Sequence, residues 1–205
     1  MLSINNFRLK LGDAELLEVS NLKINNSEKH LILGNNNTGK SLFLKSIHGL
    51  NSKFEGEILI KEKPPIFYKR KKKTILIETG PHLLWEEDVW KNIILPLPKV
   101  TSRQKQKIME LCKTAELFDD LKTKPDKLSY SSQKFIELIR AVIQLPYLIL
   151  LDDLDCYFDE INLSKAMEIC DFALNAGTSI LATSKTGLEN FKNIYRIQSK
   201  VLKKL

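Results

Sequence analysis

The chain has 205 residues, which is enough for one domain with a buried core and at most a small insertion. Apolar residues make up 43% and charged residues 28%, and no apolar run approaches the ~18 residues of a bilayer-spanning helix, so the composition favours a globular protein over an integral membrane protein. Much of the net charge of +7 lies in the basic runs 68–73 and 200–205, which we interpret as solvated surface, with contact to a membrane surface as the second interpretation.

The first third of the chain is rich in short β-like runs. The opening MLSINNFRLK has no apolar segment of the secretory type, which predicts a cytosolic protein. Apolar residues at helical spacing follow Ser41 and stop at Gly49, where glycine suits the end of a helix. The predicted strands in this third are 16–24, 30–33, 56–60 and 74–78.

The remaining residues alternate between helical and strand patterns. Helices are predicted over 101–123, 131–145 and 161–177, and strands over 147–153 and 178–184. Pro146 ends the second of these helices, and Gly177 ends the third. Continuous apolar strands alternating with helices predict an α/β fold with a parallel sheet covered on both faces. The helix-rich middle, about 80–145, is expected to form a subdomain within a single domain over 1–205.

The segment from Gly34 to Ser41 has the pattern of a phosphate-binding loop, or P-loop, between a strand and a helix. Its glycines let backbone N–H groups curl inward around phosphate oxygens, and the helix N-terminus adds partial positive charge. Lys40 is expected to reach the β- and γ-phosphates, and the Ser41 hydroxyl to bind Mg²⁺. The alternative is a polar turn without a ligand. The nucleotide-binding candidates are Gly34, Asn35, Asn36, Asn37, Thr38, Gly39, Lys40, Ser41 and Leu42.

A buried strand, YLILLDD, ends in two acids. Asp152 at its carboxyl edge is expected to hold Mg²⁺ through water while Ser41 binds it directly. Asp153 would face the water that attacks the γ-phosphate. For one of these acids, the alternative role is the N-cap of a helix.

These motifs resemble the ATP-binding subunit of an ATP-binding cassette (ABC) transporter. LSYSSQKFIELIRAVIQLPYLILLDDLDCYFD is similar to the family pattern of an LSGGQ signature, an Arg-Ala pair, a proline and LLLLDEP, and WKNIILPL resembles a segment of the lipoprotein-release, cell-division and lipid-transport cassettes. The resemblance implies a P-loop NTPase fold of the ABC type, with a small N-terminal antiparallel β part. It also implies two such subunits enclosing ATP and Mg²⁺, each signature facing the partner's ATP, which assigns Ser129 and Ser131 to nucleotide binding.

Several positions depart from the family pattern. Tyr130, Ser131 and Ser132 replace the GGQ of the signature, so side chains should crowd the partner's γ-phosphate. Asp153 replaces the catalytic glutamate and is shorter by one methylene, and Ser184 replaces the switch histidine. Thr79 takes the place of the glutamine that senses Mg²⁺, with Glu78 as the alternative register. The aromatic residue that stacks on adenine would fall near Lys10, so it is missing unless Phe7 serves.

The sequence therefore predicts retained Mg-ATP binding with slow hydrolysis, catalysed by Asp153 and Ser184. The expected partners are a transmembrane permease-type subunit, which would dock near residues 79–100 at the inner face of the membrane, and a second ATPase subunit, identical or different. Trp85 and Trp90 are either anchors for the permease or core residues. A non-hydrolysing scaffold and a DNA-associated ABC ATPase remain alternatives; no nucleic acid is expected, because a long coiled-coil insertion is absent.

Overall fold

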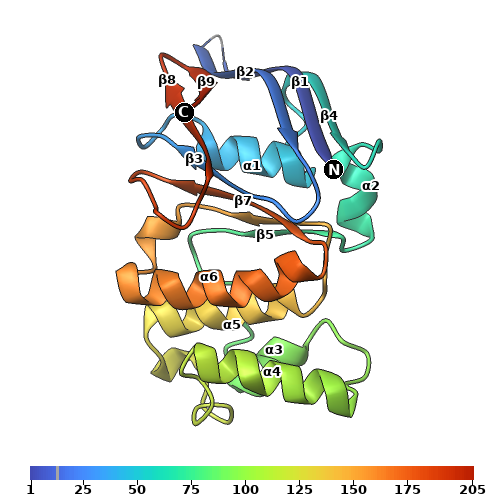
Figure 1. Ribbon diagram of the computed structural model, residues 1–205, viewed down its shortest axis with the longest axis vertical. Helices are drawn as coiled ribbons and strands as arrows, with labels where there is room; N and C mark the ends of the chain where they lie inside the picture. Colours follow the sequence, from blue (N-terminus) through green and yellow to red (C-terminus); the bar gives the residue numbers. More distant parts are fainter. Residues whose placement is uncertain (13) are drawn as a thin grey trace.

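The computed structural model describes residues 1–12 and 14–205. Within them, nine strands form one sheet in the order β4-β1-β2-β9-β8-β3-β7-β6-β5. Their bounds are β1 Leu2–Leu11, β2 Ala14–Ile24, β3 Lys29–Leu33, β4 Glu55–Ile60, β5 Thr74–Ile77, β6 Leu148–Leu151, β7 Ser179–Ser184, β8 Asn193–Gln198 and β9 Val201–Lys204. Figure 1 shows the sheet curling over α1 at the top of the molecule, with the other long helices below.

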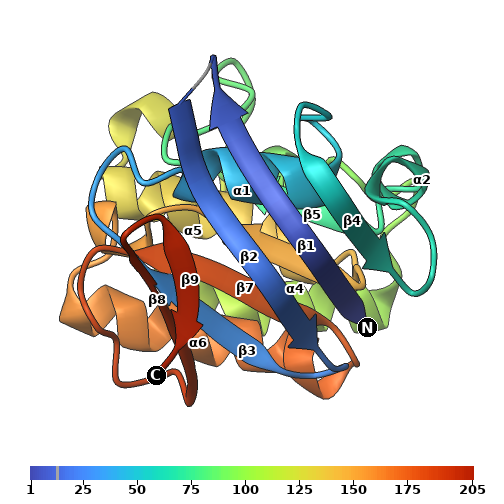
Figure 2. The same cartoon turned by 90° about the horizontal axis from the view of Figure 1, so that it is seen from above.

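The sheet has a parallel block that runs from β8 to the edge strand β5, and an antiparallel part at its other edge. β5, β6, β7, β3 and β8 pair in parallel, and the apolar runs within β3, β5 and β6 suit this buried arrangement. β1 pairs antiparallel with both β2 and β4, and these three strands lie across the top of the molecule (Figure 2). The predicted α/β class, the mainly parallel sheet and the N-terminal antiparallel part are confirmed.

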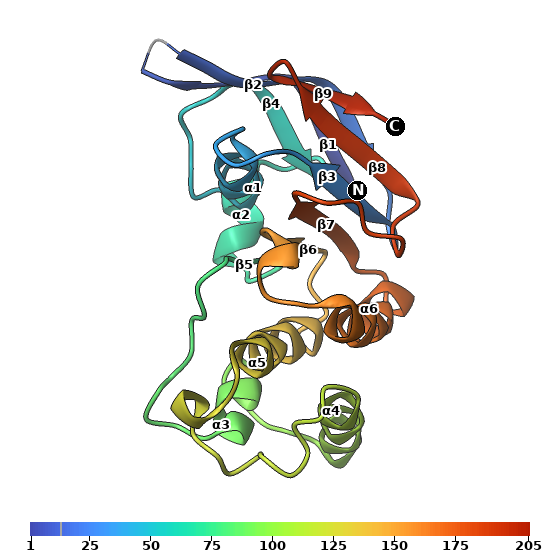
Figure 3. The same ribbon diagram turned by 90° about the vertical axis from the view of Figure 1, so that its left-hand side faces the viewer.

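Helices cover both faces of the parallel strands. Their bounds are α1 Lys40–His48, α2 Pro65–Arg70, α3 Val89–Ile94, α4 Ser102–Thr114, α5 Tyr130–Val142 and α6 Glu160–Asn175, with 3₁₀ turns η1 Pro125–Lys127 and η2 Leu154–Cys156. One core cluster lies between the antiparallel strands, α1 and one sheet face. The other runs from the opposite face through α5 and α6 to α3 and α4, so the layers stack in the order seen in Figure 3. The single domain with an inserted helical subdomain over 80–145 stays a prediction.

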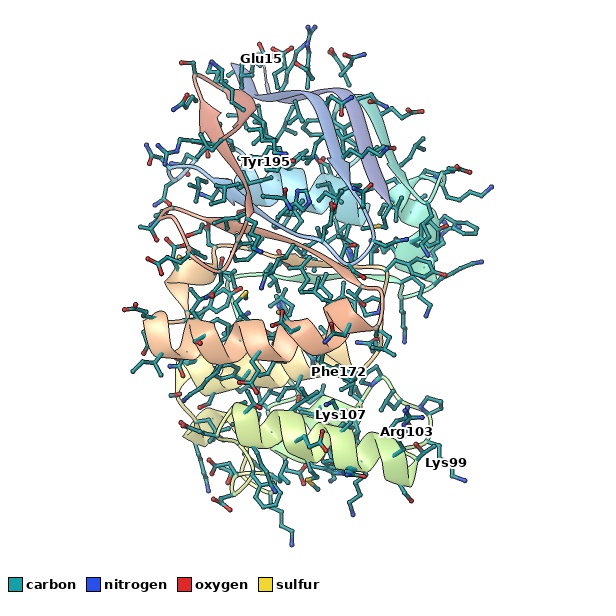
Figure 4. The ribbon with its side chains drawn as sticks, in the orientation of Figure 1. Glu15, Lys99, Arg103, Lys107, Phe172 and Tyr195 are labelled. Carbon is teal, nitrogen blue, oxygen red and sulfur yellow. The ribbon has the colours of Figure 1, made fainter. Side chains whose placement is uncertain are left out.

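Helix α4 is shorter than the predicted helix over 101–123. It begins with a capping box between Thr101 and Gln104 and ends at Thr114. Glu116 has a φ of 55°, and the buried Leu117 donates its N–H to the Cys112 carbonyl, which closes the helix by a left-handed turn. Apolar spacing alone cannot distinguish a continuing helix from this cap. Along α4, Lys107 lies over the ring of Phe172 on α6, 4.9 Å from its centroid (Figure 4).

Three further findings bear on the sequence predictions. Helix α5 ends at Val142 rather than at residue 145, since Leu145 has a φ of 45° just before Pro146. Part of the basic run 68–73 lies in α2, a helix that the pattern did not predict. Trp90 is half-buried against the core, which fits the core interpretation. Trp85 is 45% exposed, which leaves it available for a surface contact.

Candidate functional site

The P-loop joins β3 to α1 and is closed by its own side chains. Asn37 and Gly39 have φ angles of 61° and 88°, which turn the backbone back towards the helix. Thr38 Oγ1 donates to the Asn35 carbonyl at 2.9 Å. A Cβ on Gly34 would lie 2.8 Å from Thr38 Oγ1, so the curl requires glycine there. The loop therefore has the shape on which the sequence prediction depends.

Lys40 is folded into the loop that it follows. Its side chain is buried, and Nζ donates to the carbonyls of Gly34 at 2.9 Å and Asn35 at 3.1 Å. The same Nζ lies 3.2 Å from Asp153 Oδ1. The ammonium group is thus fixed at the mouth of the curl, where an anionic ligand would exchange for these carbonyls.

Asp152 stands at the end of β6, buried beside the loop. Thr183 Oγ1 on β7 donates to Asp152 Oδ1 at 2.9 Å, and the Ser41 hydroxyl lies close enough to the carboxylate to lower its pKa. Burial raises the pKa of Asp152, and these two hydroxyls offset it in part. A buried carboxylate beside hydroxyl oxygens is a donor set suited to a hard cation such as Mg²⁺.

Asp153 is held in an unusual backbone conformation. Its φ is 47° and its ψ is 62°, and its N–H donates to Thr183 Oγ1 at 2.8 Å. Oδ1 is buried and, among the described residues, lies within ion-pair distance of Lys40 but accepts no aligned hydrogen bond. This buried oxygen is free to bind a polar group that reaches the loop.

Ser184 and Thr79 lie at the carboxyl ends of two parallel strands, β7 and β5. Their contacts within the described residues are not with the side chains of the P-loop. The Ser184 carbonyl accepts from the P-loop N–H of Gly34 at 3.1 Å, but its hydroxyl donates to the Thr186 carbonyl at 2.8 Å. Thr79 follows β5, and its carbonyl accepts from the Tyr130 hydroxyl. The neighbouring Glu78 turns to Lys45 on α1, at 2.9 Å. Backbone position, rather than a side-chain contact, brings these two candidates to the site.

Ser129 and Ser131 are separate from the P-loop. Ser129 caps α5: its hydroxyl accepts the N–H of Ser132 at 3.2 Å and donates to the Ser132 hydroxyl. Among the described residues, no hydrogen bond or ion pair joins either serine to residues 34–41. The N-terminus of α5 therefore presents exposed polar groups away from the chain's own loop.

The adenine side of the site has no exposed aromatic in the expected place. Phe7 is fully buried against Phe43, with ring centroids 4.9 Å apart, so it cannot act as a stacking platform. Lys10 pairs with Glu55 at 2.8 Å. Leucine side chains approach the loop instead: a Cβ on Gly39 would lie within 3.6 Å of Leu9, Leu16 and Leu17.

The sequence analysis did not predict the role of Thr183 or the hydrogen bond from the Tyr130 hydroxyl to the Thr79 carbonyl. Thr183 is fully buried and bonds both Asp152 and the backbone of Asp153. The hydroxyl of Thr183, directly after the apolar run Ile180–Ala182, was the available signal, since a buried polar side chain needs a partner. The Tyr130 contact joins residues 51 positions apart, so no local pattern could show it.

The model of the ABC transporter family matches residues 17–155, which is more than half of the chain. The chain belongs to the ABC transporter family. The methionine import ATP-binding protein MetN of Clostridium acetobutylicum is 31% identical over 75% of this chain and 51% of its own length. This chain thus spans about half the length of the curated relatives that it matches first.

Solved structures of ABC proteins share the fold. An ATP-binding subunit of an ABC transporter superposes with a TM-score of 0.84 at 18% identity, covering 100% of this chain and 90% of that one. CbiO1 of Clostridium perfringens, described as part of the transporter complex cbiONQ, gives 0.80 at 18% identity, over 98% and 86%. The narrower resemblance to lipoprotein-release, cell-division and lipid-transport cassettes stays a prediction.

Proposed function

We propose that this chain is the ATP-binding subunit of a membrane ABC complex and binds Mg-ATP at residues 34–41. The observation that carries the proposal is the buried Lys40, held at the mouth of a closed P-loop and paired with Asp153. Backbone N–H groups of the loop and the α1 N-terminus would surround the phosphates. Lys40 would move from the Gly34 and Asn35 carbonyls to the phosphate oxygens.

The residues at the loop fit a magnesium ion. Ser41 would ligate it, and Asp152 would hold it through water, with Thr183 fixing the carboxylate. Bound magnesium would neutralise charge that develops on the phosphate oxygens during transfer to water. Thr79, at the end of the neighbouring strand, is the candidate residue for sensing the ion.

We expect hydrolysis to be slow. Asp153 would orient the attacking water, but its carboxylate is shorter than the family glutamate and is paired with Lys40 in this structure. The Ser184 hydroxyl is directed to Thr186 and cannot act as an imidazole. Loss of one preorganised group typically costs ~10²–10³ in rate, and such losses do not add. A non-hydrolysing scaffold is the second candidate, because the same Ser184 contact favours it.

The membrane partner would dock beside the segment that follows β5. A cavity of about 200 Å³ there is lined by polar and apolar side chains from α1, β5, α5 and that segment, and its polar lining includes His48, Glu78, His82 and Arg140. Leu84 and Trp85 are 44% and 45% exposed nearby in sequence, which suits an apolar contact with a permease-type subunit. This docking would place the chain at the cytoplasmic face of a membrane. In residues 1–12 and 14–205, no helix is both long enough and apolar enough to cross one.

A second ATPase subunit would complete the nucleotide site. Ser129 and Ser131 lie away from the chain's own P-loop, at the exposed N-terminus of α5. They would contact the γ-phosphate of ATP held by the P-loop of the partner subunit. A second copy of this chain and a different ATPase subunit would both use the same exposed surface.

Mg-ATP binding to the purified chain tests the proposal directly. Lys40→Ala should abolish binding measured by calorimetry, because it removes the cation at the mouth of the loop. Lys203→Ala on β9 is the matched control and should bind like the wild type. An unchanged affinity for ATP in Lys40→Ala would refute the phosphate-loop assignment.

A further inference from the structure

Helix α5 is joined to the segment 78–82 by four side chains on one helix face. Tyr130 donates to the Thr79 carbonyl, and Lys134 Nζ donates to the Glu78 carbonyl at 2.5 Å. One and two turns further on, Glu137 accepts the N–H of His82 at 2.7 Å, and Arg140 donates to the His82 carbonyl at 2.6 Å. The backbone after β5 is thus bonded to α5 along its whole length.

Tyr130 occupies the position of the first signature glycine, where the sequence predicted that its side chain would crowd a partner's ATP. The structure shows the phenol bonded to the chain's own Thr79 instead. Burial raises the pKa of Tyr130, and the negative charge of Glu137 raises it further, which agrees with a ring folded back along α5. The hydroxyl is the only polar atom of this side chain, so it alone can fix the ring there by a hydrogen bond.

We propose that the Tyr130 hydroxyl is a positioning group that holds the ring against Thr79 and keeps the Ser129–Ser131 face of α5 open to the nucleotide of a second subunit. Without the hydroxyl, the ring loses its only hydrogen bond and can rotate over the first turn of α5. A bulky side chain there would block close approach to the γ-phosphate. This inference rests on the proposed function, because it assigns that exposed face to ATP across a dimer.

The contact also joins two parts of the nucleotide site within one chain. Thr79 follows the strand next to Asp152, whose N–H bonds the Ile77 carbonyl at 2.9 Å. A shift of residues 78–82 on docking of a membrane partner would therefore be transmitted through Tyr130 to Ser129. Lys134 supports the same segment but lies one turn away from the exposed face.

Hydrogen exchange on the full chain tests the contact itself, with Tyr130→Phe, Tyr130→Gly and Tyr147→Phe as variants. Tyr130→Phe should speed exchange about three- to tenfold in residues 78–83 and 129–133, with no change at the P-loop. Tyr147 lies at the opposite end of β6, and Tyr147→Phe should leave both segments unchanged. Equal exchange in Tyr130→Phe and wild type would overturn the proposal.

Mg-ATP binding and turnover then separate positioning from simple structural support. Tyr130→Phe should lower the turnover rate at least threefold with unchanged affinity for Mg-ATP, whereas Tyr130→Gly, which removes the ring, should match or exceed the wild type. A parallel fall in both variants would mean that the tyrosine only stabilises the fold and would refute positioning.

If the wild type binds Mg-ATP without measurable turnover, the hydrogen-exchange result alone decides whether the Tyr130 hydroxyl has a positioning role. If the wild type does not bind Mg-ATP at all, the proposed function fails, while the exchange experiment still decides whether Tyr130 holds the segment.

Discussion

Lys40 Nζ and Asp153 Oδ1 lie 3.2 Å apart, so the cation of the P-loop and the second acid after β6 neutralise each other in this structure. A phosphate group that attracts Lys40 would separate the pair and leave Asp153 without its counter-ion. Under the proposed function, binding of the nucleotide and release of the candidate base would therefore be linked through one contact. Both partners are largely buried, which makes the exchange of partners energetically significant.

Restoring the two altered groups should raise ATP turnover. Asp153→Glu extends the carboxylate towards the water, and Ser184→His supplies an imidazole near the γ-phosphate. We expect the double variant to hydrolyse Mg-ATP at least about tenfold faster than the wild type. A phosphate-release assay measures this, with each single variant as control because Ser184 is fully buried and histidine is larger. No increase in a folded double variant would place the limiting defect elsewhere, in the signature first of all.

Thr183→Val should destabilise the protein and weaken Mg-ATP binding. The valine keeps the shape of the side chain but leaves Asp152 Oδ1 and the N–H of Asp153 without their shared partner. We expect a loss of about 1–3 kcal/mol in the free energy of unfolding, measured by urea titration. Thr186→Val, at an exposed position beyond the end of β7, is the control and should change stability less. Equal stability of Thr183→Val and wild type would contradict the bridging role.

The Lys134–Glu137 pair should show strong coupling. Lys134 is 1% exposed and Glu137 is 4% exposed, and their charged groups lie 2.5 Å apart. Lys134→Met leaves the buried Glu137 carboxylate without its closest cation, with Arg140 at 3.5 Å and the His82 N–H remaining, so we expect a loss of about 3–5 kcal/mol. In Lys134→Met/Glu137→Gln the uncompensated charge is gone, and part of that loss should be recovered. A double-mutant cycle of unfolding free energies checks this; strictly additive losses would show that the pair is not coupled.

Stability should fall as the pH drops from about 6.5 towards 4, because of His48. Burial, and next to it the charge of Lys69, lowers the pKa of His48 from 6.5 to about 4. In this window the unfolded chain binds a proton that the folded chain does not, so acid favours unfolding. The contribution reaches about 2–3 kcal/mol below pH 4.

His48→Gln isolates this contribution. Burial also lowers the pKa of His30, which titrates in the same direction, so only the difference between wild type and variant reports on His48. Urea titrations at pH 7.5, 6 and 5 should show the variant losing less stability than the wild type. Parallel losses in the two proteins would exclude His48 as the cause.

The amino-acid sequence determined the parts of this protein that depend on neighbours along the chain. Three features follow from residues within a few positions of one another: the P-loop, the cap at Gly49 and the buried strand before Asp152. Their causes are backbone freedom, apolar periodicity and local polar residues. The α/β class followed from the order of the predicted helices and strands, and the family followed from the order of the motifs along the chain. The missed end of α4 was local too, but Glu116 in a left-handed turn has no distinctive residue type.

Only the tertiary structure decided which side chains meet across the fold. Thr183 reaches the two acids from a neighbouring strand, Lys40 pairs with Asp153 across 113 positions, and Tyr130 turns to Thr79 rather than outward. Sheet order and helix packing set these distances, and neither can be predicted from the spacing of residues within one helix or strand. The sequence thus predicted what this protein binds, and the packing of α5 against the segment after β5 decided where the side chain of Tyr130 lies.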